Sequence, residues 1–285
     1  MIYIEYISDV SDYEKYNSNN HEKDPNDAEI KDKDYKTEIS KTHLSNCLDV
    51  IEYPVEWIYC LTNAESKLLL TVCETGQLVM RRPKIYDDEL KERIEDRFNK
   101  SWTEGEWFMR MDASSPKDSS VNLPYRSVSD VVNAIVTSKR SYKALGDDVK
   151  NKTITKLYFV RYDANWKSER EMRCFIRNRK LTAISQYSWY EYEFFCELTE
   201  EELIRIAGEV KTFISHIIDK ICDKIGTDDI VMDIYLNDDH TLKIVELNSF
   251  GYWLASGSGL FHWLIDKQRL YNTTGDVYFR ILKKK

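Results

Sequence analysis

Hydrophobic residues recur every three or four positions in several segments, and this spacing predicts amphipathic helices. The longest such pattern runs from Leu203 to Ile221. Thr199 and Glu202 have the spacing of a capping box, which would begin this helix. Weaker patterns of the same kind predict further helices at residues 87–102, 127–145 and 260–271.

Apolar and polar residues alternate elsewhere, and this period of two predicts strands and hairpins. One hairpin is expected at residues 171–188 with its turn at RNRK, and another at residues 228–250 with its turn at NDDHT. Single strands are expected at residues 1–8, 67–73, 78–83, 105–112 and 155–163. Since helices alternate with antiparallel hairpins, the predicted fold class is α+β rather than a parallel doubly wound sheet.

The N-terminal segment, residues 1–45, differs from the rest of the chain. After the short strand, residues 17–41 are polar, charged and poor in apolar residues. This composition predicts a flexible insertion that lies outside any binding site. The main folded domain is therefore expected at residues 46–285.

Composition narrows the possible partners. The chain of 285 residues has a formal net charge of -8, so duplex DNA is not an expected partner, because phosphate binding needs a basic surface. The six cysteines form no CxxC pair, which argues against a zinc knuckle and favours reduced, buried thiols. Since no apolar run approaches 18 residues, a soluble cytoplasmic protein without membrane contact is expected.

The second hairpin carries the most specific chemistry. If its turn is centred between Asp239 and His240, Asp233 lies opposite Glu246, and Asn248 projects from the same face. Two carboxylates and an amide oxygen are ligands that suit Mg²⁺, which often binds carboxylates together with substrate phosphates. An ordinary polar edge of a hairpin accounts equally well for this spacing.

Three other segments carry groups that could bind phosphate. Arg110 ends a strand just before a loop that contains Ser114, Ser115, Lys117 and Asp118, and exposed N–H groups, hydroxyls and a lysine can bind phosphates. The same SSPKD sequence also makes a good turn. In the second segment, Arg161 lies near the end of the strand expected at residues 155–163.

In the third segment, Arg173 lies within the first strand of the hairpin expected at residues 171–188. An arginine in mid-strand needs a carboxylate or a phosphate as its partner. Glu171, two residues away on the same face, is the structural alternative to a phosphate.

Four segments occur in an order that resembles the cell division cycle protein 123 family: FMRMDASSPKD, FVRYD, EMRCFI with KLTAISQY, and MDIYL with IVELNSFG and GLFHW. The resemblance extends from about residue 50 to about residue 280. It implies an ATP-grasp-like fold in which two α+β lobes hold ATP and Mg²⁺ between them. It also implies a role as an assembly chaperone that binds the gamma subunit of translation initiation factor 2.

The resemblance also implies roles for individual residues. Asp233, Glu246 and Asn248 match the metal ligands, and Glu246 stands where familiar eukaryotic members have aspartate. Arg110 matches a basic residue that is directed at the phosphates, and those members have lysine there. The remaining implied ATP contacts are Ser114, Ser115, Lys117, Arg161, Tyr162, Asp163, Arg173 and Gln186.

Three functions are compatible with these features. The first is a nucleotide-binding assembly factor, and this is the function that the resemblance favours. The second is an ATP-grasp ligase that activates a carboxylate or a nucleic-acid end by phosphoryl or nucleotidyl transfer. The third is a binding protein with a vestigial nucleotide site, which the intact set of Asp233, Glu246 and Asn248 argues against.

Overall fold

The computed structural model describes residues 1–12 and 14–283, and its contacts divide the chain into two compact units. Unit 1 combines Met1–Tyr53 with Trp166–Lys285, and unit 2 consists of Pro54–Asn165. Unit 2 is therefore inserted between two stretches of unit 1. The N-terminal segment belongs to unit 1.

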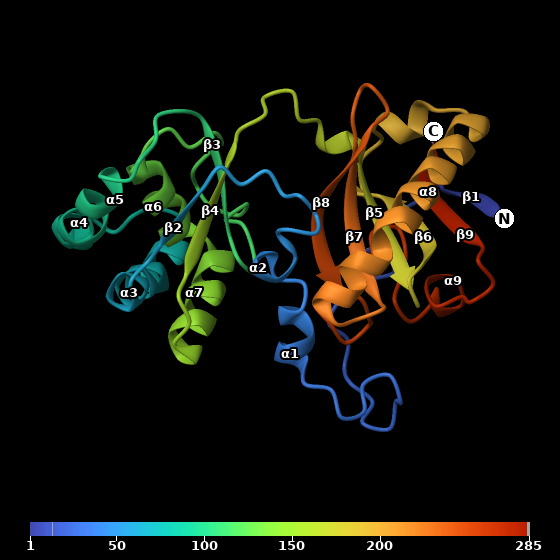
Figure 1. Ribbon diagram of the computed structural model, residues 1–285, viewed down its shortest axis with the longest axis horizontal. Coiled ribbons are helices and arrows are strands. Elements are labelled where there is room, and N and C mark those ends of the chain that lie inside the picture. Colours follow the sequence, from blue (N-terminus) through green and yellow to red (C-terminus); the bar gives the residue numbers. More distant parts are fainter. Residues whose placement is uncertain (13, 284–285) are drawn as a thin grey trace. The chain divides into compact units, whose positions relative to one another are not determined.

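A six-stranded sheet forms the centre of unit 1 (Figure 1). Its strands, in order across the sheet, are β1 (Ile2–Ile7), β9 (Val277–Leu282), β6 (Lys180–Gln186), β5 (Glu171–Arg177), β7 (Ile230–Leu236) and β8 (Leu242–Ser249). The β1–β9 and β9–β6 pairs are parallel and the others are antiparallel. Both predicted hairpins and the predicted N-terminal strand are thus confirmed.

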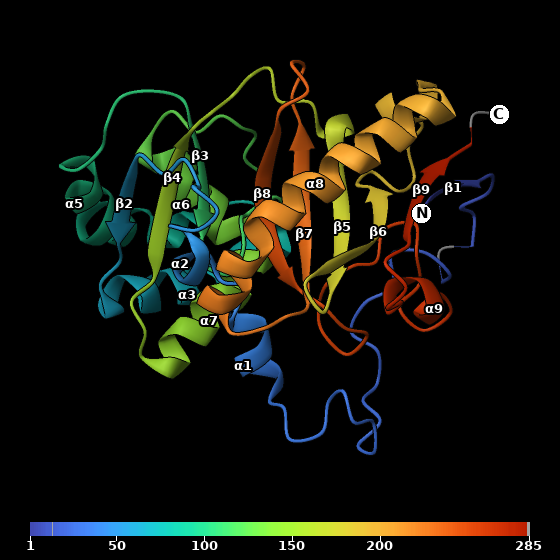
Figure 2. The ribbon, with the colours of Figure 1, turned by 45° about the vertical axis from the view of Figure 1, so that its right-hand side comes forward.

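Helix α8 (Glu200–Ile225) lies across one face of this sheet (Figure 2). The predicted capping box is present, because Thr199 accepts a hydrogen bond from the Glu202 N–H and the Glu202 side chain accepts from the Thr199 N–H. Gly226 ends the helix with a φ of 70°, a left-handed conformation that glycine adopts without steric cost.

The opposite face of the sheet is covered by a loop rather than by a helix. We call residues 250–266 the covering loop, and its aromatic side chains pack against Phe175 and Val231 of the sheet. The predicted helix at residues 260–271 is therefore wrong except for the short α9 (Lys267–Leu270). The apolar residues of this segment follow the surface of the sheet instead of a helical stripe.

Unit 2 contains a three-stranded sheet, with the order β2 (Trp57–Cys60), β4 (Lys156–Arg161) and β3 (Trp107–Met111). One apolar core joins this sheet to α3 (Asn63–Val79), α6 (Val128–Thr137) and α7 (Lys139–Asn151). The strands predicted at residues 67–73 and 78–83 are wrong, because the first range lies within α3 and the second covers the end of α3 and the turn that follows it. A capping box between Thr62 and Glu65 begins this helix.

The predicted helix at residues 127–145 is divided at Ser138 into α6 and α7, and the Ser138 side chain caps α7. The helix predicted at residues 87–102 is present as short consecutive segments. The remaining elements are α1 (Tyr35–Ser40), α2 (Leu44–Cys47), α4 (Asp87–Leu90), α5 (Asp96–Asn99), the π-helix η2 (Lys91–Glu95), and the 3₁₀ turns η1 (Lys84–Tyr86), η3 (Ser168–Arg170) and η4 (Phe194–Glu197).

Candidate metal and phosphate site

The β7–β8 hairpin brings the three predicted metal ligands to one face of the sheet. Asp233 pairs directly with Glu246, as predicted, and Asn248 pairs with Val231 in the neighbouring row. The register shifts by one residue beside Asp233, because Val245 is an extra residue on β8. This β-bulge turns Glu246 and Asn248 toward the face that carries Asp233.

Arg173 on β5 contacts the Asp233 carboxylate through both of its oxygens. Arg173 Nε donates to Asp233 Oδ1 at 2.9 Å, and Nη2 donates to Oδ2 at 2.8 Å. Asn248 Nδ2 lies 3.2 Å from Asp233 Oδ2 and 3.3 Å from Glu246 Oε1, so this one amide bridges the two carboxylates. The alternative partner considered for Arg173, Glu171, accepts a hydrogen bond from Trp166 Nε1.

Burial makes the charges of this cluster strongly interdependent. Asp233 is 1% exposed, whereas Glu246 and Asn248 are half-buried. Burial alone would lower the pKa of the Arg173 guanidinium. The negative charge of Asp233 and its hydrogen bonds outweigh burial, so the pKa of Arg173 is raised above its ordinary value. Arg173 is therefore a permanent cation beside two opposed carboxylates.

The cluster belongs to a longer series of polar residues, which we call the polar row. Strand pairing connects its members directly across the whole sheet: Glu5, Arg280, Ser185, Arg173, Asp233 and Glu246. Arg280 forms ion pairs with Glu5 and with Asp266 of the covering loop. Such buried charges are tolerated because each one has a hydrogen-bonded partner.

Four residues of this site were not predicted from the sequence: Glu5, Ser185, Asp266 and Arg280. The signal that drew attention to Arg173 was present for Arg280 as well, because it lies in mid-strand between Phe279 and Ile281. Its partners could not be deduced from spacing, since Glu5 is 275 residues away in the sequence.

Gln186 is the remaining predicted ATP contact in unit 1, and its side chain does not join the polar row. It pairs with Met172, and successive residues of a strand point to opposite faces, so Gln186 points away from the face of Ser185 and Arg173. Its Nε2 donates to the carbonyl oxygens of Ser188 and Glu191 at 2.8 Å. Gln186 thus holds the turn that follows β6.

In unit 2 the loop after β3 is fixed against helix α7. The Asp118 carboxylate accepts hydrogen bonds from the N–H groups of Lys139 and Arg140, which are the first two residues of that helix. The Ser115 carbonyl accepts from Arg140 Nε at 2.9 Å, and the Ser114 hydroxyl lies 3.5 Å from the Arg140 carbonyl. This turn therefore has a structural role, while Lys117 is exposed.

The other predicted residues of unit 2 lie on β3 and at the end of β4. Arg110 is buried in β3, opposite Tyr158. Arg161 forms an ion pair with Glu56, and its guanidinium lies 4.2 Å above the Trp107 ring.

After β4 the chain turns. The Tyr162 N–H donates to the Glu106 carbonyl, and the Asp163 side chain accepts from the Asn165 N–H. Several predicted ATP contacts thus lie together in unit 2, but each one bonds to neighbouring groups of that unit. These residues are Ser114, Ser115, Lys117, Arg161, Tyr162 and Asp163.

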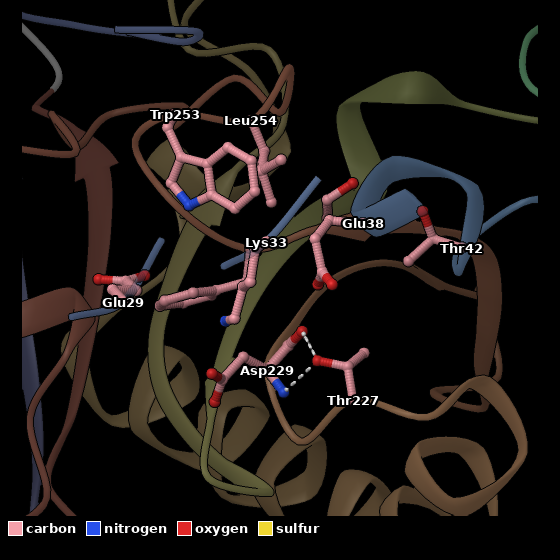
Figure 3. Close-up of a pocket in the computed structure, with 10 residues that line it drawn as sticks. Glu29, Lys33, Glu38, Thr42, Thr227, Asp229, Trp253 and Leu254 are labelled. Atoms are coloured by element: carbon pink, nitrogen blue, oxygen red, sulfur yellow. Dashed lines mark hydrogen bonds between the residues drawn. The ribbon is translucent and has the colours of Figure 1, made fainter. Parts of the chain in front are cut away.

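A small cavity of about 20 Å³ lies in unit 1 between the N-terminal segment and the far end of the β7–β8 hairpin (Figure 3). Its charged lining residues are Glu29, Lys33, Glu38 and Asp229. A space of this size holds about one water molecule, so it is too small for a nucleotide. None of the residues that line it belongs to the Asp233 cluster.

The donor set of the cluster fits Mg²⁺ by its chemistry. Asp233 and Glu246 offer carboxylate oxygens, and rotation of the Asn248 amide about its last bond exchanges Nδ2 for Oδ1 as the atom that faces them. Within residues 1–12 and 14–283, no group of three or more His, Cys, Asp or Glu side chains is arranged to hold a metal ion. The cluster would therefore depend on the amide and on ligands from a substrate, as Mg²⁺ sites commonly do.

The D123 family model matches residues 77–285, which is well over half of the chain. The chain belongs to the D123 family. This result confirms the resemblance to the cell division cycle protein 123 family that the ordered segments indicated.

A D123-family relative is a CDC123-like protein of Acanthamoeba polyphaga mimivirus, which is 32% identical over 167 residues. The match covers 55% of this chain and 49% of the viral protein, so the chain spans about half the length of that relative. The structure of Cdc123 from Schizosaccharomyces pombe matches with a TM-score of 0.62 and 18% identity, over 88% of this chain and 98% of Cdc123. A C-terminally truncated form of the same protein gives 0.60 and 17%, with the same coverage.

These likenesses show that the D123-family chain has the fold of Cdc123. The predicted α+β fold class is thereby confirmed. In the part of the chain that the structure describes, no helix is both long enough and apolar enough to span a membrane.

Proposed function

We propose that this protein binds ATP together with Mg²⁺, and that Asp233, Glu246 and Asn248 hold the cation. The observation that carries the proposal is the direct pairing of two carboxylates on one sheet face, with an amide 3.2 and 3.3 Å from them. Like charges placed opposite each other destabilise a sheet unless something neutralises them. A divalent cation bound by both carboxylates would lower the repulsion between them further than Arg173 alone does.

Arg173 completes the chemistry that the proposal requires. Its charge is permanent, and its planar guanidinium can contact phosphate oxygens as it contacts the Asp233 carboxylate. When bound, Mg²⁺ would screen the phosphate charges, while Arg173 would orient Asp233 and attract the nucleotide. Contacts of ATP with Arg110, Ser114, Ser115, Lys117, Arg161, Tyr162 and Asp163 in unit 2, and with Gln186, stay predictions.

Calorimetric titration with Mg²⁺–ATP tests the proposed site. Asp233→Asn and Glu246→Gln each remove one negative charge at nearly constant volume, and we expect each to weaken binding by more than about tenfold. Asp239→Asn is the matched control, because Asp239 lies in the exposed turn of the same hairpin and bonds to Thr241. Equal affinities for the wild type and Asp233→Asn would refute the metal assignment.

We further propose that the nucleotide-bound protein binds the gamma subunit of translation initiation factor 2, as the family resemblance implies. Affinity capture of the purified gamma subunit, with and without Mg²⁺–ATP, checks this partner. We expect retention that depends on the nucleotide and is lost in Asp233→Asn. No retention in either condition would exclude this partner.

The same preparations separate an assembly factor from an ATP-grasp ligase. An assembly factor should bind ATP and hydrolyse it slowly even when its partner is present. A ligase should release ADP or AMP in proportion to an acceptor. Stoichiometric product release with a carboxylate acceptor would therefore favour the ligase.

A further inference from the structure

Residues 17–21 run along the covering loop and bond to its backbone. We call this segment the N-terminal strap. The N–H groups of Asn17, Asn20 and His21 donate to the carbonyl oxygens of Gly259, Leu254 and Tyr252, at 2.7, 3.0 and 2.8 Å. The order of these contacts shows that the two segments run in opposite directions.

Side chains at one end of the strap add to this contact. Asn17 Oδ1 accepts a hydrogen bond from the Gly259 N–H at 3.3 Å. Ser18 Oγ accepts from the Trp263 N–H at 2.9 Å and lies 3.1 Å from Ser258 Oγ. Asn17 has a φ of 49°, in the left-handed region that asparagine tolerates better than most residues. Its conformation suits this position.

Gly257 connects the strap to the polar row. A Cβ atom at Gly257 would lie 2.2 Å from Asn17 Oδ1 and 3.3 Å from Arg173 Nη1, so any side chain at this position would displace the Asn17 amide. The Gly257 carbonyl accepts a hydrogen bond from Arg173 Nη1 at 2.8 Å. The other two guanidinium nitrogens of Arg173 bond to Asp233.

All three guanidinium nitrogens of Arg173 are therefore directed by fixed acceptors. The Asp233 carboxylate binds Nε and Nη2 along one edge of the guanidinium group, and the Gly257 carbonyl binds Nη1, the remaining nitrogen. Asn17 packs against Gly257 and accepts a hydrogen bond from the Gly259 N–H, so it contacts the loop on both sides of Ser258. A displacement of the covering loop would rotate Arg173 and thereby move the Asp233 carboxylate.

We infer that Asn17 is a positioning residue for the Asp233 cluster, acting through Gly257 and Arg173. In its bearing on cation and nucleotide affinity, this inference rests on the proposed function. It changes the sequence-based interpretation of residues 17–41 as a spacer outside the site. Small displacements of a preorganised group reduce binding strongly, even when the displaced residue does not touch the ligand.

The first test needs no ligand. Nitrogen-15 NMR follows the Nε–H signal of Arg173, which is assigned by its loss in Arg173→Lys. We expect this signal to shift or broaden in Asn17→Gly, because the Gly257 carbonyl is no longer held. In Asn20→Gly the signal should stay in place, because Asn20 has nearly the same φ of 50° and holds the strap through its backbone N–H.

The second test measures the affinity for Mn²⁺–ATP by electron paramagnetic resonance. We expect Asn17→Gly to weaken binding by about tenfold and Asn20→Gly by less than about twofold. Asn17→Asp keeps an oxygen acceptor at the same atom and should restore most of the affinity. Gly257→Ala should weaken binding at least as much as Asn17→Gly, and adding Asn17→Gly to Gly257→Ala should cause no further loss, because it removes the clash.

The outcomes separate the two proposals. An unchanged Arg173 signal in Asn17→Gly overturns the positioning role, whether or not the protein binds nucleotide. Equal losses of affinity in Asn17→Gly and Asn20→Gly also overturn it, because they would show only general loosening of the strap. A wild-type protein that binds no Mn²⁺–ATP, together with a shifted signal, refutes the proposed function and leaves the positioning of Arg173 supported.

Discussion

Replacing Arg173 with methionine tests how much the Asp233 cluster depends on its cation. The change keeps a similar side-chain volume and removes both charge-assisted hydrogen bonds to Asp233, at 2.9 and 2.8 Å. Asp233 is 1% exposed and faces Glu246, so its carboxylate would be left buried beside a second negative charge. Removing one partner of a buried ion pair costs about 3 to 5 kcal/mol.

For a unit of this size, that cost corresponds to a melting temperature lower by roughly 6 to 20 °C. Scanning calorimetry measures the change, and hydrogen exchange of the β5 and β7 amides assigns the transition to unit 1. Arg205→Met is the matched control. It removes an exposed pair with Glu209 on α8, which contributes about 0.3 to 0.5 kcal/mol.

Mg²⁺ gives the experiment a second readout. Free Mg²⁺ without ATP needs no arginine beside its phosphates and would no longer be repelled by Arg173. If the cation binds at Asp233 and Glu246, free Mg²⁺ should therefore raise the melting temperature of Arg173→Met more than that of the wild type. A variant that is destabilised no more than Arg205→Met would refute the reasoning about the buried pair. A large loss without rescue would count against the cation site alone.

Three further changes have defined outcomes. Gly76→Ala would place a Cβ atom 2.3 Å from a backbone carbonyl of α6, and thermal melts should show unit 2 destabilised by about 1 to 3 kcal/mol. Gly146→Ala is the control: its Cβ atom has its nearest neighbour at 3.8 Å, so this change should be neutral or stabilising. Thr199→Ala removes the cap of α8 and should cost about 1 kcal/mol in urea unfolding, whereas Thr212→Ala within the helix should cost less. Burial, with a contribution from the neighbouring imidazole of the N-terminal strap, lowers the pKa of His262. Below the ordinary value of about 6.5 the unfolded chain therefore binds a proton that the folded chain does not, and stability falls. His262→Asn keeps an acceptor for the two N–H groups that follow, so its melting temperature should fall less than that of the wild type between about pH 7 and pH 5.

The pairing of Asp233 with Glu246 was predictable from the sequence, but the turn position and the bulge that produce it were not. The prediction placed the turn between Asp239 and His240 in a regular hairpin. The structure pairs Leu236 with Leu242, which centres the turn on Asp239, and the Val245 bulge then restores the predicted partner. Residue spacing cannot reveal a bulge, because an extra residue leaves the apolar pattern on either side intact.

Helix α3 shows where local patterns mislead. The segment KLLLTVC has the apolar density of a strand, yet the Thr62–Glu65 capping box and the burial of Leu68, Leu69 and Val72 on one side fix a helix. Tertiary packing decides such short apolar runs. The family fold was predictable for a different reason, since several ordered motifs together are far more specific than any one of them.

The polar row could not be predicted from the sequence, because its contacts connect strands that are far apart along the chain. Arg173 clearly needed a partner, but Glu171 was nearer in the sequence than Asp233. Only the strand order of the sheet shows that Arg173 lies between Ser185 and Asp233.

The insertion of unit 2 into unit 1 has a consequence for synthesis on the ribosome. All contacts within unit 2 become available as soon as residue 165 has emerged, so this unit can fold early. Strand β1 must wait for β9, and Glu5 is translated 275 residues before Arg280. At common elongation rates this interval lasts roughly 15 to 55 s. During that time β1 lacks its partner strand, so its backbone N–H and C=O groups can pair with other chains before the native sheet is complete.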